Sequence, residues 1–344
     1  MASRCSLVLI NYKTAALAVD AIRSARAASG TPLQVVVVDN SVDDAEADAL
    51  RPHADVLIAP RQNRGYAAAI NRARRDCDGD VLLVCNADVK FDRQAVDRLM
   101  DADAAVAGPA LFWDDAFEWH LPPAELHTAA ETLDRAVASR SPTWRRRRDR
   151  RRVLQRINFW RLQKTTKTPA ISGAVMAVRT QTFDRLGGFD ERFLLYFEEN
   201  DFLRRVRDDI VYVPAARCRH IYNQSAAVSP QAAAMYARSE SEYLRKWNSA
   251  WLARLAKKLE RGPAEADAEP MEDELRIERD DVIVEASPLP DFDTAAGLLR
   301  PRPVVQVPPD VWSAYRGGVL YLRLVQRDTG AVVSTYAKAS VLYQ

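Results

Sequence analysis

The sequence predicts an α/β fold in which a mostly parallel β-sheet is covered by helices on both faces. Short apolar runs alternate with helix-length segments over residues 1–110. These runs are apolar throughout, as is typical of parallel strands buried on both faces. Beyond about residue 275 the pattern changes to short β-rich runs, which predict a small, mostly β module at the C-terminal end.

The N-terminal elements follow one another in a strand–helix order. Strands are expected at residues 6–11, 34–38, 55–58 and 81–85. Helices are expected at 15–28, at 66–77 and from Asp92, as the capping residue, to Met100. The run 7–10 is too short for the apolar core of a signal peptide, so we expect a strand and not a leader.

The remaining elements are expected to be less regular. A strand over 171–178, a helix over 180–186, a helix over 198–206, a strand over 210–213 and a long helix over 230–260 follow. The C-terminal strands are expected at 282–284, 304–307, 319–325 and 331–336, with a hairpin turn at Asp328-Thr329-Gly330. We therefore expect a main domain over 1–260, with a basic insert at about 114–168 and C-terminal helices at 229–260, an acidic linker over 261–281, and a β-rich module over 282–344.

The composition is that of an ordinary globular chain. Hydrophobic residues make up 48% of the 344 residues and charged residues 28%. The 49 basic and 47 acidic side chains nearly cancel, which excludes a generally basic nucleic-acid binder. No apolar run approaches the roughly 20 residues that cross a bilayer. The four cysteines form no CxxC pair, which is typical of reduced thiols in a cytoplasmic protein.

Two acidic side chains directly follow buried strands. Ligands of parallel α/β sheets bind at the carboxyl ends of the strands, where we expect Asp39 and Asp88 to lie. The carboxylate of Asp88, in Asn86-Ala87-Asp88, is a suitable ligand for Mg²⁺ or Mn²⁺ next to a diphosphate. The alternative is that these residues only form the turn after the strand.

Three further groups are candidates for a site. The glycine of Asn63-Arg64-Gly65-Tyr66 allows a tight turn before a helix, and the amides of Asn63 and Asn71 could face a nucleotide; a capped helix is the alternative. Carboxylates in 187–191 and 198–201 suit a general base at a helix start, or simply favourable N-terminal helix charge. His220 is either a metal ligand or a structural histidine.

In this order, the motifs resemble glycosyltransferase family 2, the inverting enzymes with the GT-A fold, a Rossmann-like sheet, and most closely its rhamnosyltransferase-like branch. The resemblance covers roughly residues 5–226. The matching pieces are 8–12, 38–41, 63–66 with Asn71, 86–88, 187–191, 198–201 and 220–225.

The resemblance implies a metal-assisted transfer from a nucleoside-diphosphate sugar, such as dTDP-rhamnose or a UDP-sugar, to a saccharide or lipid-linked saccharide in cell-surface polysaccharide synthesis. It implies a divalent metal, Mg²⁺ or Mn²⁺, held by Asp88 and His220, and a general base at Glu199 or, as the alternative, Glu198. Donor contacts are implied for Asn11, Tyr12, Asp39, Asn40, Asn63, Gly65, Asn71 and Asn86. Acceptor contacts are implied for Asp190, Glu191 and Gly173.

An arginine-rich run, Arg145–Arg152, precedes apolar residues with helical spacing: Val153, Leu154, Ile157 and Trp160. A basic segment that leads into an apolar face suits an anionic membrane surface or a lipid-diphosphate acceptor. The protein would then be cytoplasmic and peripheral on the inner face of the cytoplasmic membrane. The alternative is a solvated helix that pairs with the acidic linker. We expect no nucleic-acid partner, because no aromatic stacking platform accompanies the arginines.

Two other classes of function stay open at this point. One is a non-catalytic scaffold that binds a nucleotide sugar or a glycan. The other is a nucleotidyltransferase on a similar sheet, which would need a glycine- and lysine-rich loop after the first strand. The sequence there reads Asn11-Tyr12-Lys13-Thr14.

Overall fold

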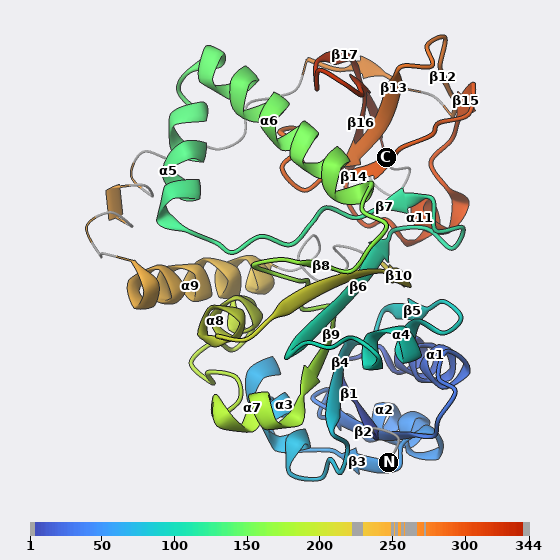
Figure 1. Cartoon of the computed structure of the whole chain (residues 1–344), viewed down its shortest axis with the longest axis vertical. Helices are drawn as coiled ribbons and strands as arrows, with labels where there is room; N and C mark the ends of the chain where they lie inside the picture. The colour runs from blue at the N-terminus through green and yellow to red at the C-terminus, as the bar shows by residue number, and fades with distance from the viewer. Residues whose placement is uncertain are drawn as a thin grey trace.

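The computed structural model describes residues 4–221, 230–248, 267–271 and 273–339, and the single positions 251, 254, 255 and 258. Over these residues the chain forms one 15-stranded sheet and one two-stranded sheet. In Figure 1 the N-terminal strands and helices lie at the bottom and the C-terminal strands at the top. Among the described helices, none combines the length and apolar character that spanning a membrane requires.

The N-terminal strands form the expected parallel sheet. They run in the order β3-β2-β1-β4, with bounds β1 (Cys5–Asn11), β2 (Leu33–Asp39), β3 (Val56–Ile58) and β4 (Val81–Asn86). Because side chains alternate between the two faces of a strand, Leu7 and Leu9 belong to one core and Val8 and Ile10 to another.

Helices cover both faces of this sheet. One core contains residues of α1 (Ala15–Ala27), α2 (Asp44–Leu50) and α4 (Ala95–Met100). The opposite core contains residues of α3 (Tyr66–Arg74), α7 (Thr180–Arg185) and α8 (Glu198–Arg205). The α/β prediction is therefore confirmed. The predicted cap at Asp92 is wrong, because α4 starts after Gln94, which has a left-handed backbone (φ 60°).

Antiparallel strands extend the sheet beyond β4. β9 (Val175–Arg179) lies between β4 and β6 (Val106–Phe112), and β10 (Ile210–His220) runs parallel to β6. β10 also pairs with β5 (Val89–Phe91) and β8 (Thr166–Lys167). A register shift between Val213 and Arg217 lets β10 continue well past the predicted strand over 210–213.

The C-terminal strands continue the same sheet. β7 (Trp119–His120) pairs with β6 on one side and with β14 (Ala296–Leu298) on the other, which joins the two parts seen in Figure 1. From there the order is β13 (Val282–Ser287), β16 (Val319–Gln326), β17 (Val332–Ala339) and β11 (Glu269–Pro270). The turn at 328–330 joins the antiparallel strands β16 and β17, as predicted.

Smaller elements complete the described chain. β12 (Leu275–Arg276) pairs with β15 (Val304–Val305), so the predicted linker over 261–281 contains two short strands, β11 and β12. The helices not yet placed are η1 (Arg51–His53), α5 (Ala129–Ala138), α6 (Pro142–Trp160), α9 (Pro230–Trp247) and α11 (Pro309–Ala314). The domain limits stay a prediction, and positions 222–229 and most of 249–266 lie outside the described residues.

The structure corrects the interpretation of the arginine-rich helix α6. Its apolar residues Val153, Ile157 and Trp160 are buried against Ile283 and Val325 of the C-terminal strands, so this face is not available to a membrane. Sequence periodicity showed the apolar face but gave no sign of the strands that cover it, which lie more than a hundred residues away.

The arginines of α6 find acidic partners inside the molecule. Arg148 contacts Glu131 (2.5 Å), Asp134 (3.0 Å) and Asp293 (2.5 Å). Arg156 contacts the fully buried Glu285 (2.7 Å). The described partners thus belong to α5, the C-terminal strands and their loops, and not to the acidic linker, so the alternative of a solvated helix paired with that linker is also wrong over the described residues.

Glu285 joins two buried guanidinium groups. It lies 2.7 Å from Arg156 and 2.7 Å from Arg323, and Arg323 also contacts Asp149 of α6 at 2.9 Å. Breaking a buried ion pair is strongly destabilising because a charge is left without compensation. This cluster therefore fixes α6 to the C-terminal strands.

We predict that Glu285→Gln lowers the free energy of unfolding by about 3–5 kcal/mol, measured by urea unfolding at pH 7. Asp281→Asn removes a solvent-exposed carboxylate that pairs with Arg279 on the same part of the chain, and it serves as the control without a measurable shift. Equal unfolding midpoints for the two variants would contradict this role of Glu285.

Candidate active site

Three polar side chains meet at the carboxyl edge of the parallel strands. The register pairs Asn11 with Asp39 and Ile10 with Asn86, so the ends of β1, β2 and β4 are level. Asp39 is 1% exposed, and its Oδ1 accepts hydrogen bonds from Asn11 Nδ2 (2.9 Å) and the Ser41 backbone N–H (3.1 Å). Its Oδ2 is buried without a partner in the described structure. A buried acceptor of this kind is a site for a ligand hydroxyl or N–H.

The structure does not support a direct donor contact for Asn11. Its amide nitrogen donates to Asp39 (2.9 Å), Ser41 (3.2 Å) and Glu46 (2.9 Å), and its oxygen accepts from Thr14. Asn11 is fully buried and holds Asp39 in place. Of its neighbours, Tyr12 is exposed at the edge, and Asn40 donates to the Gly65 carbonyl (3.3 Å).

Asp88 and His220 face each other at this edge. The antiparallel pairing of β10 with β5 places His220 opposite Val89, next to Asp88. The distance from His220 Nε2 to Asp88 Oδ1 is 3.3 Å, and both side chains are largely buried. A carboxylate oxygen and an imidazole nitrogen at this spacing are suitable ligands for Mn²⁺ or Mg²⁺. The described residues contain no group of three or more His, Cys, Asp or Glu side chains that could hold a metal alone, so this pair would need oxygens from a substrate.

Gly65 and Tyr66 position the turn in front of α3. Gly65 has φ +93°, and a Cβ there would lie 2.5 Å from the Leu194 carbonyl oxygen. Its N–H donates to Asn63 Oδ1 (2.8 Å), so Asn63 shapes the turn. Only glycine fits this conformation and this close approach.

Tyr66 is a site residue that the sequence motif contained but did not single out. Its hydroxyl donates to Asn86 Oδ1 (3.0 Å). Burial raises the pKa of Tyr66 well above its ordinary value, and the charges of Glu198, Glu199 and Asp88 raise it further. The phenol therefore stays protonated between the strand-end residues and the carboxylates of α8.

Glu198 and Glu199 form a desolvated pair at the start of α8. The residues before them, Tyr196 and Phe197, both have φ 68°, a left-handed conformation that is strained for aromatic side chains and is found at functional sites. Burial raises the pKa of both glutamates, and the neighbouring charge of Glu199 raises that of Glu198 further. Glu198 Oε2 is buried without a partner in the described structure. Glu199 Oε1 accepts from Asn200 (3.2 Å).

Gly173 leaves room for Glu199. A Cβ at position 173 would lie 3.0 Å from Glu199 Cγ and 3.2 Å from its Cβ. The loop before β9 and the start of α8 therefore approach closely at this point. The predicted acceptor contact of Gly173 stays a prediction.

Other predicted contacts are occupied within the protein. Asn71 donates to the Phe189 carbonyl (2.9 Å) and Glu191 Oε1 (3.1 Å), and its oxygen accepts the Phe189 N–H (2.9 Å). Asn71 thus holds the loop 187–191, and its predicted donor contact stays a prediction. Asp190 accepts from Arg192 and Lys246, which lower the pKa of this carboxyl. Asp190 and Glu191 thus take part in the structure of this loop, and their predicted acceptor contacts stay predictions.

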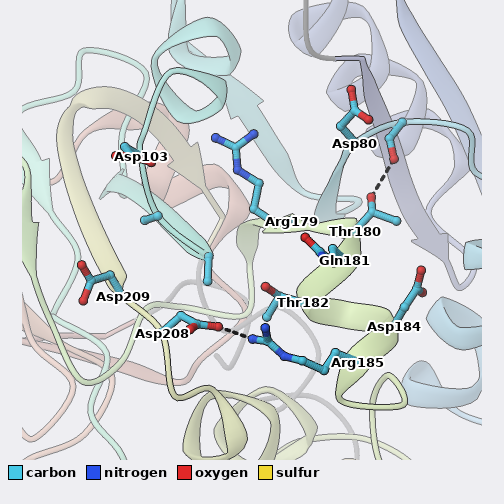
Figure 2. Close-up of a pocket in the computed structure, with 13 residues that line it drawn as sticks. Asp80, Asp103, Arg179, Thr180, Gln181, Thr182, Asp184, Arg185, Asp208 and Asp209 are labelled. Atoms are coloured by element: carbon cyan, nitrogen blue, oxygen red, sulfur yellow. Dashed lines mark hydrogen bonds and ion pairs between the residues drawn. The ribbon is translucent and has the colours of Figure 1, made fainter.

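A separate cavity lies at the opposite edge of the sheet (Figure 2). Arg179, in its wall, pairs with Val81 at the amino end of β4. Figure 2 shows Thr180 hydrogen-bonded to a backbone carbonyl and Arg185 paired with Asp208, so its polar groups are partly satisfied. This cavity is not part of the edge that carries Asp39, Asp88 and Glu199.

The fold and the site define an α/β enzyme with carboxylates gathered at the carboxyl edge of a parallel sheet. Residues 6–172 match the model of the family described as Glycosyl transferase family 2. This part of the chain belongs to glycosyltransferase family 2, and the protein is a transferase enzyme.

Known proteins of similar sequence and shape include glycosyltransferases. The N-acetylglucosaminyl-diphospho-decaprenol L-rhamnosyltransferase of Mycobacterium tuberculosis, in strains CDC 1551 / Oshkosh and H37Rv, is 26% identical over 250 residues, 63% of this chain and 75% of the relative. A mannosyltransferase from Pyrobaculum calidifontis, solved with GDP-Man and Mn²⁺, shares 16% identity over 75% of this chain and 74% of its own (TM-score 0.45). GalNAc-T7, solved with UDP, GalNAc and Mn²⁺, is 15% identical in sequence, and the match covers 71% of this chain and 47% of that one (TM-score 0.46).

We predict that the buried pair makes stability fall as pH rises from 5 to 8. A carboxyl group with a raised folded-state pKa binds more protons in the folded than in the unfolded protein over this window. Glu198→Gln removes one such group, so the urea midpoint of the variant should fall less with pH than that of the wild type. Glu278→Gln, at an exposed position, is the control. Parallel pH curves for the wild type and Glu198→Gln would contradict the coupling.

Proposed function

We propose that this glycosyltransferase moves a sugar, with inversion, from a nucleoside-diphosphate donor to a hydroxyl of a lipid-linked saccharide in cell-surface polysaccharide synthesis. The observation that carries the proposal is the convergence of Asp39, the Asp88–His220 pair and the Glu198–Glu199 pair at one sheet edge. The name of the mycobacterial relative favours a rhamnose donor, such as dTDP-rhamnose, and makes a UDP-sugar donor the second choice. It also favours an acceptor linked to a lipid diphosphate.

Asp39 is the proposed nucleoside contact. One carboxylate oxygen is held by Asn11 and Ser41, and the other is buried and available to accept a hydrogen bond. A base N–H or a ribose hydroxyl would satisfy it. Because Asn11 fixes the carboxylate from inside the sheet, the group is already oriented before the donor binds.

Asp88 and His220 are the proposed ligands of a divalent cation, Mn²⁺ or Mg²⁺. When bound, such a cation neutralises the charge of a departing diphosphate. The protein contributes one carboxylate and one imidazole, 3.3 Å apart. Asn86 and Tyr66 lie beside them and add neutral polar groups to the same edge.

Glu199 is the proposed general base. Inversion requires a carboxylate to take the proton of the acceptor hydroxyl as its oxygen attacks the anomeric carbon from the side opposite the diphosphate. Burial raises the pKa of Glu199, which strengthens it as a base once it is ionised. Burial raises the pKa of Glu198 as well, and the charge of Glu199 raises it further, so the two carboxyl groups disfavour a second negative charge.

The exposed side of α6 supports a proposed membrane contact of a purely electrostatic kind. Arg146, Arg147 and Arg150 are exposed, lie on one side of the helix, and form no ion pair within the described part of the chain. The apolar face is buried, so insertion into the bilayer is not part of this proposal. Cationic side chains close to an anionic surface each contribute about 1 kcal/mol to binding.

We predict that Asp88→Asn and Glu199→Gln each reduce transfer from dTDP-rhamnose by at least a hundredfold. Calorimetric binding of the donor in the presence of Mn²⁺ should weaken strongly in Asp88→Asn and remain in Glu199→Gln, because only Asp88 contacts the cation and diphosphate. Glu242→Gln, on the surface of α9, should behave as the wild type. Full turnover by Glu199→Gln would move the base to another residue, and lack of turnover by the wild type with every donor would favour a scaffold.

We predict that the triple variant Arg146→Ser, Arg147→Ser, Arg150→Ser loses binding to vesicles that contain phosphatidylglycerol, measured by flotation at low salt. The matched control replaces Arg23, Arg51 and Arg279, three arginines that pair with nearby carboxylates elsewhere on the surface. If both triple variants float to the same extent, α6 is not the contact surface.

A further inference from the structure

A second cavity lies where the C-terminal strands meet the glycosyltransferase sheet. Its wall is formed by β7, β14, the end of α6 and the residue that follows β16. In Figure 1, β7, β14 and the end of α6 come together at the lower border of the C-terminal strands. The residues that matter for the argument are Phe117, His120, Trp160, Arg161, Arg300 and Arg327.

One side of this cavity is lined by fixed aromatic rings, of which Phe117 and His120 are partly exposed and Trp160 is buried. The ring of His120 lies 4.6 Å from that of Phe112 and 6.1 Å from that of Trp160, with the second pair stacked. Trp160 donates its indole N–H to the Leu121 carbonyl (2.8 Å), which fixes the ring. The same ring occupies the space that a side chain at Gly297 would need. Burial, together with the charge of Arg217, lowers the pKa of His120 to about 4, so this ring is neutral at physiological pH.

The other side carries positive charge without compensation. Arg161, Arg300 and Arg327 form no ion pair with any carboxylate in the described part of the chain. Arg327 donates from its Nη2 to the carbonyls of Asp280 (3.0 Å) and Val282 (3.2 Å), and its Nε is buried without a partner. The carboxylate that lines the cavity, Glu118, pairs with Arg302 at 3.2 Å.

Rigid aromatic faces beside guanidinium groups suit one kind of ligand. The apolar face of a sugar ring packs on aromatic side chains, while guanidinium forks bind carboxylate and phosphate oxygens in a bidentate manner. We propose that this cavity is a binding site for an anionic saccharide, with its sugar ring against the partly exposed rings of Phe117 and His120 and its carboxylate or phosphate on Arg161, Arg300 and Arg327.

The cavity lies close to the end of β10 that carries His220. Phe112 pairs with His120 on one side and with Arg219, next to His220, on the other, so two strand spacings, about 10 Å, separate His120 from that end of β10. The site is therefore a distal subsite for the acceptor, an assignment that rests on the proposed function.

Three disaccharides that differ only at one C6 position test the proposal: cellobiose, cellobiouronic acid and cellobiose 6′-phosphate. Titration calorimetry is carried out on the full chain without donor. We expect binding of one or both anionic sugars at least tenfold tighter than that of cellobiose. The preferred anion identifies the source as a uronic acid or a sugar phosphate.

The double variant Arg161→Gln, Arg300→Gln should lose that tenfold preference, because both side chains lie at the exposed rim of the cavity. Arg51→Gln, Arg279→Gln removes the same charge elsewhere and should keep it. Equal affinity for neutral and anionic sugars, no binding of any of the three, or unchanged binding by Arg161→Gln, Arg300→Gln would overturn the proposal.

The result does not depend on catalysis. Transfer by the wild type with no anion-selective binding would leave the proposed function standing and remove the subsite. Anion-selective binding in a protein that transfers no sugar would do the reverse. If the wild type both transfers sugar and binds anionic saccharides selectively, Arg161→Gln, Arg300→Gln should raise the KM for an anionic acceptor and leave kcat nearly unchanged. A general loss of structure would not produce this result.

Discussion

The parallel pairing of β1 with β2 and β4 is the constraint on which the site depends. It brings Asn11, Asp39 and Asn86 level at one edge, and Asn11 donates a hydrogen bond from its amide that holds Asp39. Tyr66 and the carboxylates of α8 reach the same edge from the face that α3 and α8 cover. The pairing of β10 with β5 brings His220 to Asp88. The functional groups thus come from distant parts of the chain but share one backbone framework.

Ion pairs also connect the other parts of the molecule. The arginines that dominate the middle of the sequence are largely absorbed by α5, the C-terminal strands and their loops, with Arg156, Glu285 and Arg323 at the buried centre. Those strands continue the glycosyltransferase sheet through β7 and β14. Arginines without an ion pair in the described part of the chain include those on the outer side of α6 and those at the cavity where the two parts join.

The strands and helices of the N-terminal half could be predicted from sequence, because the spacing of apolar residues and the turn residues between them determine secondary structure over short stretches of chain. The ends of β2 and β4 placed Asp39 and Asp88 correctly for the same reason. The roles of Asn71 and Asp190 could not be predicted, because their partners, the loop 187–191 and Lys246, meet them only in the folded chain. The burial of the apolar face of α6 and the length of β10 depend likewise on distant strands and on a backbone irregularity.

A crystal structure with the donor nucleotide and Mn²⁺ tests the central claim most directly. We expect the nucleoside to contact Asp39 Oδ2, the cation to lie between Asp88, His220 and the diphosphate, and Glu199 to stand on the open side of the anomeric carbon. A nucleotide bound at the amino edge around Arg179, or at the carboxyl edge with Asp39 and Asp88 both untouched, would contradict the account.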